Sequence, residues 1–361
     1  MNYFISRSVM FLVLSLTLIF SCQKNPTELI EAQNIIKPEI LYVARKSVHQ
    51  GWGDAVSINI MDAQGNNHRE IISVNDGAVV DPYFSNDGEK IVFVMHSDTL
   101  DPGENLYTIN YDGTGLSQIT LSDSTLSYNV PQFTADKSKV VYQARVNSGK
   151  IEIRVLNIAS KQQTILAPQT NSVLRPVLSP DGNYVFYNNI DGNVYKASLD
   201  GTSNIKLTDT NYTSQVQIDG TGTAIYFVSM IEHQIFDLFS MDLDGNDLSR
   251  VTGLNDLSCA YFRISSDGLK IINLTSSPSG HSFDIMDSNG DHRNTIQINK
   301  RCWSTFEFFP DGKNVIFEVD GDIDHNSDYH IYKIGISGEN MTILSLDKYH
   351  DNQFSCFRPE S

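Results

Sequence analysis

Histidine and tryptophan are the residues of this 361-residue sequence best suited to binding or chemistry, and most of them lie in predicted loops. We expect one group to combine aromatic rings with ionisable side chains: His49, Trp52, Arg301, Trp303, His325, Tyr349, His350 and Asp351. Flat apolar rings beside hydrogen-bonding groups suit a sugar or peptide ligand. The alternative is that these large side chains shield loop backbones and bind nothing.

A divalent metal is a weaker hypothesis. His233 and His281 precede Phe236-Asp237 and Phe283-Asp284, so they occupy similar places and could hold manganese or zinc between them. Two aspartate-rich stretches, 242–247 and 320–324, resemble calcium loops but lack the distal carboxylate, so solvated acids are expected there. We therefore expect no cofactor, with a metal as the open alternative.

These candidate residues lie within a repeated sequence unit, which sets their positions in the fold. Its clearest copy is Ser179-Pro180-Asp181-Gly182-Asn183-Tyr184-Val185-Phe186-Tyr187, and versions return about every forty residues along the chain. Asp-Gly between apolar runs is a strong hairpin signal, because glycine accepts the positive φ of a tight turn. A second Asp-Gly in the same copy predicts a unit of four strands with two tight turns and one looser loop.

The two ends of the repeat array complement each other. The first copy opens with what reads as a second strand, 40–44, whereas the tail 353–361 matches a first strand with nothing after it. Six whole copies plus one split copy predict an all-β, seven-bladed β-propeller of four-stranded blades over residues 39–361, with one blade closed by the C-terminal strand. The alternatives are an open sandwich or two unrelated β domains.

Blade connectivity sorts the loops onto two faces. The Asp-Gly turns share one face, where turn geometry explains them. The opposite face carries the second-to-third loops and the links between blades, and we call it the loop-rich face. Because the first and seventh blades are neighbours in a closed ring, the eight ligand-binding candidates are expected to meet at one seam on this face.

The repeat also carries a family resemblance. Phe84-Ser85-Asn86-Asp87-Gly88-Glu89-Lys90-Ile91-Val92-Phe93 and Leu178-Ser179-Pro180-Asp181-Gly182-Asn183-Tyr184-Val185-Phe186 resemble the WD40-like PD40 repeats. Such repeats occur in the TolB propeller and in the amino-terminal propeller of dipeptidyl-peptidase-IV-like enzymes. The resemblance implies a fold more than an activity. In place of TolB's small α/β domain only a short tether is expected, and no G-x-S-x-G motif of a hydrolase occurs.

The N-terminus is typical of an exported protein. Residues 1–21 hold Arg7 followed by an apolar run too short to span a bilayer, which predicts a signal peptide. Ile19-Phe20-Ser21-Cys22 resembles a bacterial lipobox, which implies lipidation of Cys22; an ordinary export signal is the alternative. Residues 22–38 are expected to be a tether, with the protein lipid-anchored in the bacterial cell envelope, on a periplasmic or surface face of the outer membrane.

Three further cysteines follow Cys22. Cys259 and Cys302 fall near the same point of adjacent repeats, so a disulfide between them is one possibility, and buried, inert thiols are the other. Cys356 lies in the predicted closing strand. None of the cysteines has metal-type spacing.

The net charge of the sequence limits the classes of partner that can be expected. The sequence has 43 acidic and 26 basic residues and a net charge of −17, which argues against nucleic acid. We expect a monomeric, non-enzymatic propeller that binds an envelope protein or glycan through its loop-rich face. The alternative is a metal-dependent polysaccharide lyase resembling the oligogalacturonate lyases, in which a histidine-held metal would acidify a proton of a uronate for β-elimination.

Overall fold

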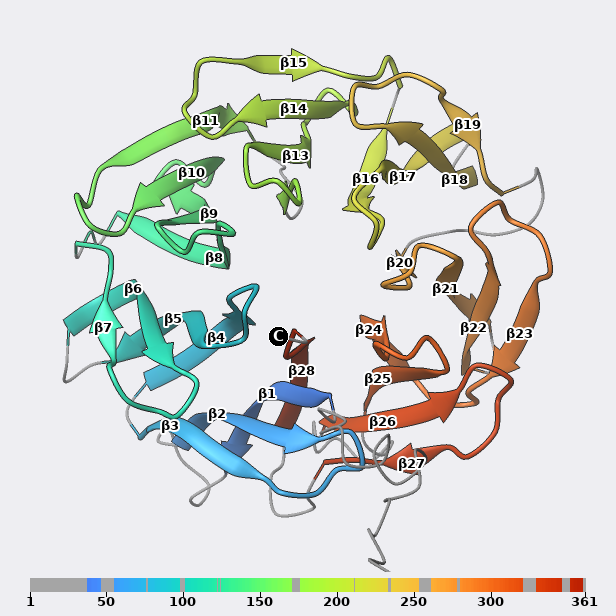
Figure 1. The fold of residues 1–361 in the computed structure, drawn as a ribbon, viewed down its shortest axis with the longest axis horizontal. Helices are drawn as coiled ribbons and strands as arrows, with labels where there is room; N and C mark the ends of the chain where they lie inside the picture. Colours follow the sequence, from blue (N-terminus) through green and yellow to red (C-terminus); the bar gives the residue numbers. More distant parts are fainter. Residues whose placement is uncertain are drawn as a thin grey trace, which may run out of the picture. The chain divides into compact units, whose positions relative to one another are not determined.

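Twenty-eight β-strands, β1 to β28, are the regular elements of the part of the chain that is described. The computed structural model describes residues 38–46, 55–75, 77–97, 101–121, 123, 125–170, 176–210, 212–232, 235–252, 261–277, 280–320, 329–345 and 351–359. One compact unit spans Lys37–Ser361. Its strands form seven blades arranged in a ring, as Figure 1 shows. The blades of a propeller surround a central channel. The predicted all-β, seven-bladed propeller is confirmed.

Each blade is an antiparallel sheet whose first strand lines the channel. Blade 1 joins the two ends of the chain: β28 (Asp351–Phe357), β1 (Glu39–Lys46), β2 (Ala55–Asp62) and β3 (Arg69–Val74). Blades 2 to 4 follow in order: β4 (Gly77–Phe84), β5 (Lys90–Ser97), β6 (Asp101–Asn110), β7 (Ser117–Gln118); β8 (Leu126–Phe133), β9 (Lys139–Val146), β10 (Ile151–Asn157), β11 (Gln163–Thr170); β12 (Val177–Leu178), β13 (Tyr184–Asn188), β14 (Val194–Ser198), β15 (Asn204–Lys206).

The last three blades repeat this order. They are β16 (Thr213–Ile218), β17 (Ala224–Glu232), β18 (Ile235–Asp242), β19 (Ser249–Arg250); β20 (Tyr261–Ile264), β21 (Lys270–Ser277), β22 (Gly280–Asp287), β23 (Asn294–Gln297); β24 (Cys302–Phe308), β25 (Asn314–Asp320), β26 (Tyr329–Gly335), β27 (Thr342–Ile343). Blades 7 and 1 are also joined by one parallel pairing, of Tyr329 with Asp351.

The ring closes through β28, which pairs antiparallel with β1 from Ile40↔Phe357 to Arg45↔Asp351. In Figure 1 the red β28 lies beside the blue strands of blade 1. The closing strand removes the free edges that an open ring would expose. The predicted split blade is therefore confirmed, with β1, β2 and β3 as its second, third and fourth strands.

Blades are held together by apolar side chains packed between adjacent sheets. Phe283 of blade 6, which is fully buried, lies 5.2 Å from Phe317 and 5.3 Å from Phe306 of blade 7, measured between ring centroids. Because both faces of a blade are covered by its neighbours, its middle strands are near-continuous apolar runs. This explains why the strand sequences alternate only loosely.

The repeated turn between first and second strands is stabilised by its own side chains. In blade 4, Ser179 Oγ donates to Asp181 Oδ1 at 2.5 Å and accepts from Tyr184 N at 2.9 Å. The hydrogen bond from Ser179 and that from the backbone of Asn183 hold the pKa of Asp181 below its ordinary value. Gly182 has φ of 69°. The aspartates of these turns therefore serve the backbone.

Blade 3 departs from the Asp-Gly pattern, with Lys137 where the glycine would be and φ of 58°. Its ammonium group crosses to blade 2, where it pairs with Asp87 and lies 2.9 Å from Glu89 Oε2. Burial alone would raise the pKa of Asp87. The hydrogen bonds from Lys137 and Ser85 together lower it by more, so the pKa lies well below its usual range. Lysine at the glycine position of this turn thus adds a contact between blades 2 and 3.

Candidate functional site

The predicted seam is only partly described. Trp303 lies in β24 and Asp351 in β28, so the backbone places these two positions in the neighbouring blades 7 and 1, and Arg301 is exposed just before β24. The remaining seam candidates lie outside the described residues: His49, Trp52, His325, Tyr349 and His350. The seam as a ligand site therefore stays a prediction. Cys22, the signal peptide and the tether up to residue 37 also lie outside the described part.

The two Phe-Asp pairs beside the metal candidates differ in register. Both β18 and β22 end at the aspartate of the following turn, and counting back from Asp242 and Asp287 puts His281 level with Phe236. His233 lies outside the described residues. A metal held by His233 and His281 therefore stays a prediction.

The side chain of His281 has a structural role. Its Nδ1 accepts a hydrogen bond from the backbone N of Cys302 at 2.8 Å, so a neutral ring carries its proton on Nε2. Among the described residues, no three His, Cys, Asp or Glu side chains are close enough together to hold a metal ion.

Sequence reasoning missed a layer of side chains that lines the central channel. One residue from the inner strand of each blade, two positions before the first residue of the turn, is half-buried, and five of these seven residues line the cavities described below. We call this set the channel layer: Cys356, Tyr83, Gln132, Val177, Gln217, Arg263 and Glu307, from blade 1 to blade 7. Numbering back from the repeated turn would have found it.

Bulges help to aim the inner strands at the channel. The pairing with the second strand shifts register in five blades, on β4, β8, β16, β24 and at the β28 to β1 pairing. In β4 and β8 the bulges hold Asp81 and Val130 at φ of 50°, which is unfavourable for a β-branched side chain such as valine. Asp81 Oδ2 accepts from Val130 N at 2.8 Å, so the bulge of one blade is fastened to the next.

Channel-layer side chains also reach to the following blade. Gln132 Nε2 donates to Pro176 O and Gln217 Nε2 to Phe262 O, both at 3.1 Å. Arg263 of blade 6 pairs with Glu307 of blade 7, with 3.4 Å between Nε and Oε2. Arg263 and Glu307 are the two charged members of the channel layer: Arg263 is always charged, and Glu307 is charged when its carboxyl group is ionised.

The two charged side chains differ in their surroundings. Arg263 is 13% exposed, its Nη1 donates to Phe262 O at 2.8 Å, and its guanidinium lies 5.3 Å from the ring centroid of Phe306. Glu307 retains 33% of its side-chain surface, facing the channel. Burial raises the pKa of Glu307 to about 7, and the positive charge of Arg263 only partly offsets this. The net charge of the Arg263–Glu307 pair therefore changes near neutral pH, as Glu307 gains or loses its proton.

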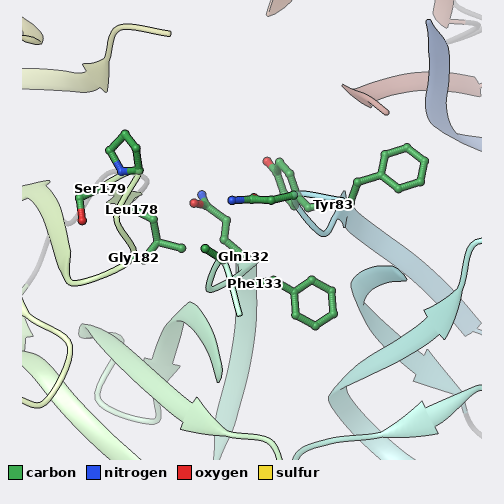
Figure 2. A pocket seen from close by; sticks show the side chains of 10 residues that line it. Tyr83, Gln132, Phe133, Leu178, Ser179 and Gly182 are labelled. Atoms are coloured by element: carbon green, nitrogen blue, oxygen red, sulfur yellow. The ribbon is translucent and has the colours of Figure 1, made fainter. Parts of the chain in front are cut away.

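Two cavities open along the channel wall, and Tyr83 lines both. The larger, about 310 Å³, lies between blades 6, 7, 1 and 2 and is bounded by Arg263, Glu307, Phe354 and Cys356. The smaller, about 260 Å³, lies at the turns between the first and second strands of blades 2 to 4. Figure 2 shows Tyr83, Gln132 and Leu178 around the smaller cavity.

The thiols near these features are inert. Cys302 is free and buried, and burial raises its pKa to about 12. Cys356 is also free, and burial raises its pKa to about 11. The disulfide considered for Cys302 is not formed, in keeping with the alternative of buried thiols; Cys259 lies outside the described residues.

The described part of the loop-rich face carries two exposed apolar side chains and one half-buried aromatic ring, which we call the blade 4–5 patch: Ile190 and Tyr212, which are exposed, and Phe236, which is half-buried. Ile190 is 56% exposed and Tyr212 is 48% exposed. The rings of Tyr212 and Phe236 lie 5.6 Å apart, centroid to centroid. Aliphatic and aromatic side chains are thus presented together on this face.

Hydrogen bonds fix the backbone beneath this patch. Thr210 Oγ1 and Thr213 Oγ1 donate to Gly192 O at 2.6 Å and 2.8 Å, which ties the link between blades 4 and 5 to the turn that carries Ile190. Tyr212 O accepts from Ser229 Oγ and Met230 N, each at 2.9 Å. The patch is therefore held in place before any partner binds.

These features define a seven-bladed β-propeller with a polar central channel. Similar solved structures include TolB from Acinetobacter baumannii, with 19% identity, TM-score 0.52 and coverage of 72% of this chain and 63% of that chain. The chain thus spans less than two thirds of that TolB. An oligogalacturonate lyase in complex with manganese has 12% identity, TM-score 0.63 and coverage of 81% and 90%.

A third similar structure is the β-propeller domain of the trilobed protease from Pyrococcus furiosus, with 14% identity, TM-score 0.62 and coverage of 86% of this chain and 97% of that domain. No protein-family model and no curated protein matches the sequence. At these identities the similarities show the fold alone: this chain has a β-propeller fold similar to those of TolB, an oligogalacturonate lyase and a peptidase propeller domain. Within the described residues, no helix has the length and apolar character to cross a membrane.

Proposed function

We propose that this protein is a non-enzymatic cell-envelope propeller that binds a protein or a glycan through its loop-rich face. The blade 4–5 patch carries the proposal, because Ile190 and Tyr212 each expose about half of their surface on that face. Because hydrogen bonds already fix the backbone that carries these side chains, less conformational entropy is lost on binding. The predicted signal peptide and lipobox at Cys22 support the envelope location.

A photo-crosslinking experiment tests this function. A photoreactive amino acid at position 190 or 212 of the full chain, expressed in its own cells, should crosslink to a partner protein. If the ligand is a glycan, Tyr212→Ala should lower binding of the purified protein to an envelope-polysaccharide array by about tenfold, as expected for losing one aromatic anchor.

Ile205 provides the matched control. It is 54% exposed, close to the 56% of Ile190, but it lies in the outer strand β15 and away from the loop-rich face. The same crosslinker at position 205 should give no partner. Equal crosslinking at 190 and 205, or array binding that Tyr212→Ala leaves unchanged together with no crosslink at 190, would contradict the proposal.

A further inference from the structure

The charges around the blade 4–5 patch indicate which kind of partner it binds. Asp191 is exposed and directly follows Ile190 in the turn between β13 and β14, and Asp209 lies in the link that leads to Tyr212. A hydrogen bond of 2.6 Å from Thr210 Oγ1, next to Asp209, joins this link to the same turn. Both carboxylates therefore lie at the rim of the patch.

One lysine is shared by these two carboxylates. Lys206 Nζ lies 2.5 Å from Asp209 Oδ1. Burial alone would raise the pKa of Asp191, but a hydrogen bond from Tyr195 and the positive charge of Lys206 are among the interactions that lower it. Two negative charges thus lie near one positive charge, so one negative charge at the rim is not compensated. The side chain of Asp209 is 90% exposed and can be reached by a partner.

The hydrogen-bonding groups beneath the patch bind one another. Thr210 Oγ1 and Thr213 Oγ1 both donate to Gly192 O. Asn193 Oδ1 accepts from Thr210 N at 2.7 Å, and its Nδ2 donates to Asp191 O at 3.1 Å. A sugar is oriented by several positioned polar groups. The described part of the patch offers mainly apolar area and carboxylates, which favours a peptide over a glycan.

We propose that the partner of the blade 4–5 patch is a protein segment that combines an apolar side chain with a neighbouring lysine or arginine. This inference rests on the proposed function of the loop-rich face. The apolar side chain packs against Ile190 and Tyr212, and the cationic side chain pairs with Asp209. A carboxylate has about four acceptor sites on its two oxygens, so a second cation fits beside Lys206.

The same charges disfavour an acidic partner. Asp191 and Asp209 would repel an anionic polysaccharide, and the net charge of −17 adds to this repulsion at longer range. A neutral glycan would gain no ion pair from either carboxylate. Charge complementarity at the rim therefore selects a cationic segment, while the apolar side chains supply the contact area.

Selection from a library of random short peptides displayed on phage tests the chemistry of the partner. The purified protein is immobilised, and phages that also bind the Tyr212→Ala variant are removed. We expect the selected peptides to combine an apolar residue with lysine or arginine. An excess of acidic or uncharged peptides would overturn the proposal. So would a glycan that binds in a Tyr212-dependent way while no peptide is selected.

A synthetic peptide of the selected sequence then measures the effect of each charge by fluorescence anisotropy. Asp209→Asn should weaken binding by about threefold, the size expected for one exposed ion pair. Lys206→Gln should strengthen binding by about threefold, because it removes the cation that competes for Asp209. Opposite effects of the two partners of one ion pair distinguish a charge effect from a loss of structure.

Lys196 and Asp244 provide the matched control. They form an exposed ion pair of 2.8 Å at an Asp-Gly turn, on the opposite face of the ring. Asp244→Asn and Lys196→Gln should leave peptide binding unchanged. Equal effects of Asp209→Asn and Asp244→Asn, or weaker binding by Lys206→Gln, would refute the role of the rim charges.

The two experiments on this patch separate the inference from the proposed function. If a crosslinker at position 190 captures a partner but the selected peptides carry no basic residue, the cationic segment is wrong and the function of the face stands. If position 190 captures nothing and no peptide or glycan depends on Tyr212, the proposed function fails together with this inference.

Discussion

Arg358 is predicted to hold the ring closed. It follows β28 and touches both neighbours of the closure: its Nη1 lies 2.8 Å from Glu39 Oε2 at the start of β1, and its Nε donates to Gly88 O of blade 2 at 3.1 Å. Its guanidinium also lies 3.7 Å from the ring centroid of Tyr111, whose hydroxyl donates to Glu39 Oε1 at 2.5 Å. Arg358→Ala removes its contacts with Glu39, Gly88 and Tyr111 at once.

The expected cost is about 2–3 kcal/mol in the free energy of unfolding. The charged hydrogen bond to a carbonyl contributes about 1.5 kcal/mol and the contact with Tyr111 about 0.5–1 kcal/mol. The ion pair, whose two side chains are each 26% exposed, adds at most about 1 kcal/mol. These contributions share one side chain and do not add fully. Arg358→Lys keeps the charge and should lose about half as much, because it lacks the planar fork.

Urea unfolding of the three proteins measures the cost. Hydrogen exchange should localise it: amides of β1 and β28 should exchange faster in Arg358→Ala, while those of β17 and β18 in blade 5 should not change. Arg145 provides the control, because it is exposed and its one described hydrogen bond, to Gly149 O, is 3.5 Å long. If Arg358→Ala and Arg145→Ala unfold within about 0.5 kcal/mol of each other, the closure does not depend on Arg358.

Two further predictions concern the blade interface and the channel. Phe283→Ala should lower the free energy of unfolding by about 3–5 kcal/mol, because it leaves a cavity between Phe306 and Phe317. Leu269→Ala, at a position 62% exposed, should change it by less than about 0.5 kcal/mol, and urea titrations giving equal losses would refute the packing argument. The pKa of Glu307 is raised from 4.5 to about 7 in the fold, so its contribution to stability is present below about pH 4.5 and is lost as pH rises through about 7. Glu307→Gln should therefore gain about 1–2 kcal/mol over the wild type between about pH 5 and pH 8, after allowance for water in the channel, and a difference that does not vary with pH in urea unfolding would show that Glu307 has no raised pKa.

The ring was predictable from sequence because its signal is repeated. The Ser-x-Asp-Gly turn recurs with the same hydrogen bond from the serine hydroxyl to the aspartate carboxylate, as at Ser85, Ser179 and Ser265, so a weak local pattern gains weight with each copy. The closing strand followed from the same turn spacing at the two ends. The start of β4 at Gly77 was not predictable, because the bulge at Asp81 interrupts the alternation that marks a strand.

The channel layer was not predicted because its members share a position and not a residue type. Tyr83, Gln132, Arg263, Glu307 and Cys356 have different chemistry, so no motif joins them, and the bulges before several of them defeat counting by alternation. The residue types that most often form binding sites, histidine and tryptophan, lie mainly in the loops and therefore became the predicted site. Only the register of each inner strand against its turn shows that one residue per blade faces the channel.

Ring closure then decides which of these residues are neighbours. Ser355, beside Cys356 near the end of the chain, donates to Pro82 O, beside Tyr83 near its start, so the two ends of the sequence form one wall of the larger cavity. Arg263 and Glu307 complete that wall because their blades are consecutive. A charged pair that is unremarkable in a linear repeat thus becomes, in a closed ring, one side of a cavity that opens to the channel.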